Sequence, residues 1–227
     1  MDRTMRKGYI AAVLTVLLSA FSYPVRDILL QYISSSVAVC LQTGFAWIFL
    51  LLYHFIFRKK ILLPPKAALQ ALLSGLLGIA GYQFLILKGT AYVGGTRASA
   101  FLGLIPILCY LWEITAERKK PTCRAVTAIA VSFLGVLLLS PASEISATGL
   151  GILYLFLADI AWVLYCVLVS GKDTSADVKT VLMYQAFSAS VIMFFICRGE
   201  LFSLMMGNEV VWFGVVYQAV FNTIGNM

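Results

Sequence analysis

Long apolar blocks, separated by short polar or basic turns, follow one another along nearly the whole chain. The blocks cover residues 8–25, 37–57, 67–87, 94–116, 123–139, 149–169, 178–197 and 210–227. Most are close to the ~20 apolar residues that an α-helix needs to cross the hydrocarbon core of a bilayer. The pattern therefore predicts an all-α fold, a polytopic membrane helix bundle of seven to eight transmembrane helices.

The composition agrees with this interpretation. Hydrophobic residues make up 61% of the chain and charged residues only 12%, and the mean hydropathy is +0.94. A soluble domain is typically about half apolar and about a quarter charged. The chain therefore has no room for a soluble domain of ordinary size.

The formal charge of +7 could suggest a nucleic-acid partner, but the basic residues lie in short turns between apolar blocks. Thirteen of the seventeen fall on alternate turns: Arg3, Arg6, Lys7, Arg58, Lys59, Lys60, Lys66, Arg118, Lys119, Lys120, Arg124, Lys172 and Lys179. Such a bias marks the cytoplasmic loops of a membrane protein. We expect a multi-pass protein of the cell membrane with a cytoplasmic N-terminus, and no nucleic acid.

The chain also contains a weak internal repeat. A shift of 143 residues aligns Gly8 with Gly151, Leu14 with Leu157, Ser19 with Trp162 and Gln42 with Gln185. Each copy would hold five helices, and because five is odd the second copy would enter the membrane from the opposite side. The repeat thus predicts an inverted topology, with a binding site where the two halves meet.

Two stretches resemble a known family. Residues 94–140 carry the run small-small-x-R-A-S, then I-P, E-R-K and G-V-L-L-L, which resembles helices four and five of the EamA-type drug/metabolite transporters. The stretch SYPVRDILLQYIS at residues 22–34 is similar to the family's ending of helix one. Helix one departs from the family at Asp27, where the family has lysine, and at Ser19, where the family has tryptophan.

The resemblance implies a secondary transporter of 5+5 helices that exports small metabolites, such as amino acids, by alternating access. Residues 1–140 would form the first repeat, and residues 149–227 an incomplete second repeat. The family pattern has ten helices, and this chain supplies seven and most of an eighth. We therefore expect a C-terminally truncated carrier that is unstable alone, recruits a partner or forms a homodimer.

Two other classes stay open at this point: a membrane-embedded enzyme, and a non-transporting scaffold or inactive gene fragment. An enzyme is disfavoured because the sequence shows no paired catalytic acids and no nucleophile with a base. His54 is the only histidine, and the five cysteines share no ligand spacing. We expect no enzymatic activity, no cofactor and no metal.

Polar and aromatic residues inside the apolar blocks are the candidate substrate-binding residues: Gln42, Tyr82, Gln83, Arg97, Asp159, Trp162 and Gln185. An ionisable group at mid-membrane costs at least ~2.5 kcal/mol, so Asp159 is either a proton or substrate-cation site or a hydrogen bond between helices. Arg97 either attracts an anionic group or reaches the headgroups. The glutamines either orient a substrate or tie helices together.

Overall fold

The computed structural model describes residues 20–59, 61–116, 122–139, 145–169, 177–204 and 209–224, with a few single positions besides. These residues are helical outside short connections and contain no strand. Five described helices are long and apolar enough to cross a membrane: Ser35–Ile56, Pro65–Val93, Gly95–Thr115, Gly149–Val169 and Val178–Glu200. The predicted all-helical, multi-pass class is confirmed.

Three shorter helical segments stand where the sequence predicts further helices. Residues 20–29 are helical, α7 covers Cys123–Leu139, and α10 covers Glu209–Tyr217. The total of seven to eight spans depends on these segments and stays a prediction.

The second predicted helix is α2, Ser35–Ile56. It begins after Ser34, whose hydroxyl oxygen accepts a 3.4 Å hydrogen bond from the Val37 N–H. Serine is a favoured residue at this position because it satisfies one of the free N–H groups of the first turn.

The third predicted helix is one long span made of α3, Pro65–Ser74, the π-helical segment η1, Gly75–Gly81, and α4, Tyr82–Val93. Pro65 suits the first turn because its missing N–H would have no partner there. The predicted end of this helix at residue 87, just before Lys88, is wrong. The helix continues to Val93 and stops at Gly94, whose φ of +81° is a conformation that glycine adopts readily.

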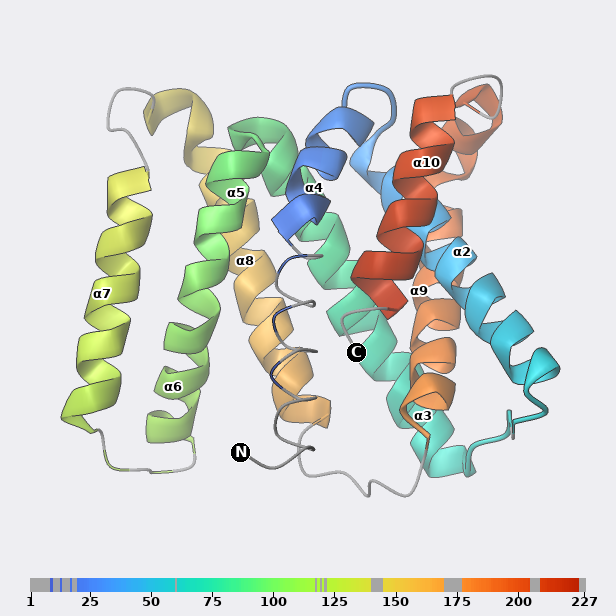
Figure 1. The fold of residues 1–227 in the computed structure, drawn as a ribbon, viewed down its shortest axis with the longest axis horizontal. Helices are drawn as coiled ribbons and strands as arrows, with labels where there is room; N and C mark the ends of the chain where they lie inside the picture. The colour runs from blue at the N-terminus through green and yellow to red at the C-terminus, as the bar shows by residue number, and fades with distance from the viewer. Residues whose placement is uncertain are drawn as a thin grey trace.

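The next hairpin consists of α5, Gly95–Phe101, the 3₁₀ turn η2, Leu102–Leu104, and α6, Ile105–Thr115, followed by α7. Pro106 lies in the first turn of α6, so the helix is interrupted just before it. In Figure 1, α7 lies at one edge of the bundle and α2 at the opposite edge, and α7 contacts α5 and η2.

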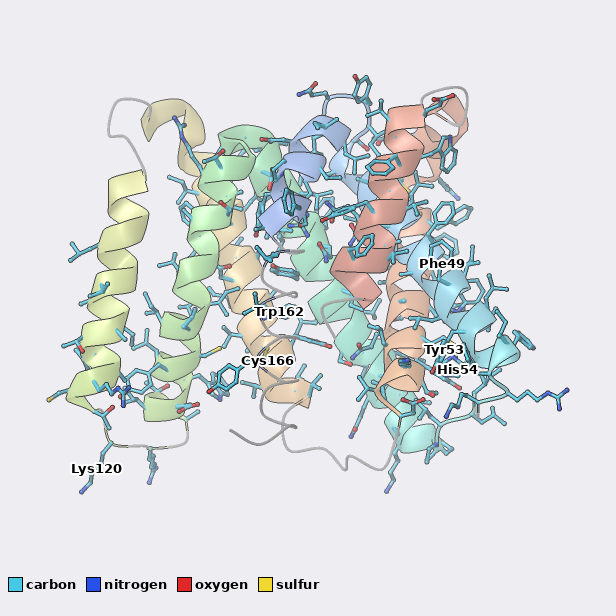
Figure 2. All side chains as sticks on the ribbon, viewed as in Figure 1. Phe49, Tyr53, His54, Lys120, Trp162 and Cys166 are labelled. Carbon is cyan, nitrogen blue, oxygen red and sulfur yellow. The ribbon has the colours of Figure 1, made fainter. Side chains whose placement is uncertain are left out.

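The helices α8, Ile145–Val169, and α9, Val178–Leu204, pack with the first half of the chain: α8 against α4, and α9 against α2. Side-chain contacts join α2 and α9 near both ends of the pair. Ser34 donates to Glu200 at one end, and His54 Nε2 lies 2.9 Å from the Thr180 hydroxyl at the other. His54 is visible at the lower end of α2 in Figure 2.

Glycines allow the helices to approach closely. A Cβ on Gly75 would lie 2.5 Å from the Gln185 backbone, and one on Gly78 would lie 2.1 Å from the Tyr165 ring. Close approach at small residues is the usual basis of helix association in membranes, because lipid provides no hydrophobic drive between helices. These contacts join η1 to α8 and α9.

Two pairs of elements are related by the same displacement along the chain. The helix α2 begins at Ser35 and α9 at Val178, which is 143 residues later. The π-helical segments η1, Gly75–Gly81, and η4, Gln218–Ile224, are related by the same displacement. Their packing is also exchanged, since η1 contacts α9 and η4 contacts α2.

Candidate substrate-binding site

Six polar or aromatic side chains from three elements lie together inside the bundle, and we call them the central polar cluster. They are Tyr23 and Arg26 of the 20–29 helix, Tyr82 and Gln83 of α4, and Asp159 and Trp162 of α8. Five of the six are buried and Trp162 is partly buried. Figure 2 shows Trp162 on α8, nearer the middle of the bundle than Cys166.

Arg26 is the cation of the cluster and is only 2% exposed. Its Nη2 donates a 2.9 Å hydrogen bond to Gln83 Oε1, which joins the 20–29 helix to α4. The guanidinium carbon lies 5.1 Å from the centre of the Tyr23 ring, a distance at which a cation is attracted to the ring face. Arg26 Nε and the Tyr23 hydroxyl are buried without a hydrogen-bond partner.

Asp159 is the acid of the cluster and is also 2% exposed. It lies within electrostatic range of Tyr23 and Tyr82, and Tyr82 is in turn within range of Arg26. The Asp159 Oδ2 atom is buried and has no hydrogen-bond partner. A carboxylate in this environment is costly unless a cation or a proton neutralises it.

Aromatic rings connect the cluster to Gln185. Tyr82 and Trp162 pack at 4.8 Å between ring centres, and Trp162 and Tyr165 at 5.1 Å. The Tyr165 hydroxyl donates a 3.2 Å hydrogen bond to Gln185 Oε1, and Gln185 Nε2 donates a 2.9 Å bond to the Ser74 hydroxyl. Gln185 therefore joins three helices, in keeping with the helix-tying alternative.

The structure brings four of the seven sequence candidates together, namely Tyr82, Gln83, Asp159 and Trp162, and connects Gln185 to them through Tyr165. The other two lie on other elements. Gln42 is buried in α2, and Arg97 is half-buried in α5.

The sequence prediction missed Tyr23 and Arg26. It ended the apolar block of the first helix at residue 25 and counted Arg26 among the four basic residues on the outer side of the membrane. The structure continues this helix to Leu29 and turns Arg26 inward, where it is buried. The sequence did contain a signal for this burial: the apolar run Ile28-Leu29-Leu30 follows the charged pair Arg26-Asp27. Such a run indicates that the helix continues beyond the charged residues, so that one of them can face the interior of the bundle.

The neighbouring Asp27 has a structural role. Its Oδ2 accepts a 2.7 Å hydrogen bond from the Gly95 N–H at the start of α5. An acid at a helix N-terminus satisfies a free N–H and is stabilised by the helix dipole. The departure of this position from the family's lysine thus coincides with a contact between the 20–29 helix and α5.

The central polar cluster has the groups needed to bind a charged small molecule. It offers one buried cation, one buried acid, tyrosine hydroxyls and aromatic faces. Within the described ranges, no group of three or more His, Cys, Asp or Glu side chains could hold a metal ion.

Comparison with known proteins identifies relatives of this chain. The EamA-like transporter family matches residues 6–140. The chain is 26% identical over 171 residues to a Bacillus subtilis (strain 168) protein named "Uncharacterized transporter YyaM", over 70% of this chain and 54% of that protein. The chain thus spans about half the length of this curated relative. No solved structure matches the chain.

Proposed function

Because this chain belongs to the EamA-like transporter family, we propose that it is a membrane transporter that carries small metabolites, such as amino acids, by alternating access. The central polar cluster is the proposed substrate site. The observation that carries this proposal is the joint burial of Arg26 and Asp159, each 2% exposed, in one neighbourhood of an apolar helix bundle. Ionisable groups inside membrane spans are expensive and typically mark substrate or ion pathways.

The proposed architecture is an inverted repeat of residues 1–140 and 149–227. The common displacement of 143 residues between α2 and α9, and between η1 and η4, supports it. The exchanged packing of η1 on α9 and η4 on α2 is what two copies related by a pseudo-two-fold axis would give. The family match also ends at residue 140.

The position of the cluster fits this architecture. Tyr23, Arg26, Tyr82 and Gln83 belong to the first proposed copy, and Asp159 and Trp162 belong to the second. Carriers of this kind bind their substrate near the bilayer midplane, between the repeats. Because Arg26 and Asp159 are closed off from the surface here, the two copies would have to rock apart to admit a substrate from either side.

Asp159 is the proposed coupling residue, which exchanges a proton or pairs with a cationic group of the substrate. Its unpartnered, buried Oδ2 supports this role. The basic turns support a cytoplasmic N-terminus in the cell membrane, and the proposed direction of transport is export.

The proposed function can be tested before the substrate is identified, by comparing the culture medium of cells that express the chain with that of cells expressing Asp159→Asn. We expect one or more small polar metabolites to accumulate outside cells with the unchanged chain and to fall toward background with Asp159→Asn. Gly149→Ala is the control, since nothing lies within 4 Å of its added Cβ. A folded, membrane-inserted chain that changes no metabolite would favour a scaffold over a carrier.

A further inference from the structure

Arg26 is a cation without an anion. Its Nη2 hydrogen bond goes to the neutral amide oxygen of Gln83, and in the part of the chain that the structure describes it makes no ion pair. The adjacent carboxylate of Asp27 uses its Oδ2 to cap α5 at Gly95. A guanidinium stays charged at any accessible pH, so it cannot relieve its burial by losing a proton.

Two hydrogen-bond donors lie unused beside this charge. Arg26 Nε and the Tyr23 hydroxyl are both buried without an acceptor. They are neighbours, because the guanidinium lies 5.1 Å from the Tyr23 ring centre and near enough to the Tyr23 hydroxyl to interact with it, but neither Arg26 Nε nor the Tyr23 hydroxyl has a partner at hydrogen-bond distance and angle. An unpaired buried donor costs about 1–3 kcal/mol, so a group that accepts from both would stabilise the site.

We propose that Arg26 and Tyr23 bind a carboxylate of the transported molecule, and that Gln83 positions the guanidinium. This inference rests on the proposed carrier function and assigns a specificity-determining residue to its site. Two donors at one place match the two oxygens of a carboxylate, and arginine is well suited to planar anions.

The charges of the cluster select a group with a single negative charge. When Asp159 is protonated or paired with a cationic group of the substrate, one carboxylate neutralises Arg26, whereas a phosphate dianion would leave an uncompensated charge in a low-dielectric site. The acid Asp159, which lies within electrostatic range of both Tyr23 and Tyr82, would repel a second negative charge. A tie between helices does not need a guanidinium, because two neutral polar groups would make the same bond without burying a charge.

The test uses the purified full chain, in proteoliposomes for flux and in detergent for equilibrium binding. The probes are labelled L-α-amino acids and short monocarboxylic acids, each paired with its carboxamide, which keeps the shape and removes the charge. We expect wild type to prefer carboxylates by about tenfold to a hundredfold, the range of a charge-assisted hydrogen bond. Arg26→Gln should abolish that preference, and Arg26→Lys should restore part of it.

Lys88→Gln is the matched control. It removes one positive charge from α4, where Lys88 lies over the Phe84 ring and outside the cluster, and it should leave the preference unchanged. If Arg26→Gln does not fold, Arg26→Lys still tests the inference, because a point charge cannot reproduce the fork geometry and the preference should fall.

The outcomes separate this inference from the proposed function. If wild type, Arg26→Gln and Arg26→Lys all transport carboxylates in equal preference to carboxamides, the Arg26 site is overturned and the carrier function stands. If carboxylates bind in an Arg26-dependent way but no flux is measured, the Arg26 site stands and the carrier function is overturned. Absence of both binding and flux overturns both. The two probe classes show whether the carboxylate comes from an amino acid or from a simple organic acid.

Discussion

Gln185 of α9 donates a 2.9 Å hydrogen bond to the hydroxyl of Ser74, which lies 111 residues earlier in the chain. With the bond that Gln185 accepts from Tyr165, this contact holds α3, α8 and α9 together. Gln185→Leu should therefore lower stability by about 1–2 kcal/mol, since hydrogen bonds between membrane helices contribute up to ~1.7 kcal/mol each. Thermal unfolding in detergent measures this loss.

The same variant distinguishes a helix tie from a substrate contact. If Gln185 only ties helices, the substrate concentration at half-maximal flux should change little in Gln185→Leu. A weakened substrate affinity at unchanged melting temperature would instead place Gln185 in the substrate site.

Gly75 is predicted to tolerate no side chain. A Cβ there would lie 2.5 Å from the backbone of Gln185, and backbone cannot move aside as a flexible side chain can. Gly75→Ala should destabilise the fold by about 1–3 kcal/mol, the usual cost of overpacking, and reduce the yield of monodisperse protein. Gly149→Ala is the control in size-exclusion profiles after heating. Equal profiles for the two variants would show that α9 does not approach η1 as described.

Asp159 should control the pH dependence of transport if it carries the coupling proton. The wild-type flux is then expected to vary with pH, because the carboxyl must gain and lose a proton in each cycle. Asp159→Asn removes the titrating group and should flatten the profile while the chain stays folded. The measurement is flux across pH in the variant and in wild type.

The control for this profile is Asp177→Asn. Asp177 accepts a 3.3 Å hydrogen bond from the Lys179 N–H at the start of α9, and asparagine caps a helix about as well as aspartate. Its profile should match wild type. A pH-dependent flux that persists in Asp159→Asn would leave Asp159 only a structural role.

The topology predicts that residues 31 and 62 lie on opposite sides of the membrane. Both are exposed, Gln31 in the turn before α2 and Leu62 in the turn after it. In a Cys123→Ser background, an impermeant thiol reagent should label Gln31→Cys from outside the cell and Leu62→Cys only after the membrane is opened. Labelling of both from the same side would show that α2 does not cross the bilayer.

The long apolar runs were sufficient to predict most of the helices. The run at residues 123–139 matches α7 in both bounds, and the run from residue 178 begins where α9 begins. The error at Lys88 has a clear cause: a basic residue usually marks the membrane edge, but its alkyl stem can stay inside the helix while the charge interacts elsewhere. Here the Lys88 ammonium lies over the Phe84 ring.

The candidate site was harder to predict, because its members are far apart in the sequence. Asp159 and Gln83 stand out as polar residues inside apolar blocks, and both are buried in the structure. Arg26 could not be assigned, since its burial depends on how far the first helix extends and on Gln83, 57 residues away. The π-helical segments η1 and η4 were also not predictable from the spacing of apolar residues, because that spacing indicates an α-helix of 3.6 residues per turn and does not reveal a local π-helix.

The most direct test of the carrier account is flux through the purified chain alone. Wild type and Asp159→Asn are reconstituted into liposomes, and counterflow is measured for each labelled metabolite that the expressing cells release. The account predicts saturable flux well above empty liposomes for wild type, and strongly reduced flux for Asp159→Asn at an equal melting temperature. Flux equal to that of empty liposomes for every metabolite, from folded wild-type protein, would contradict it.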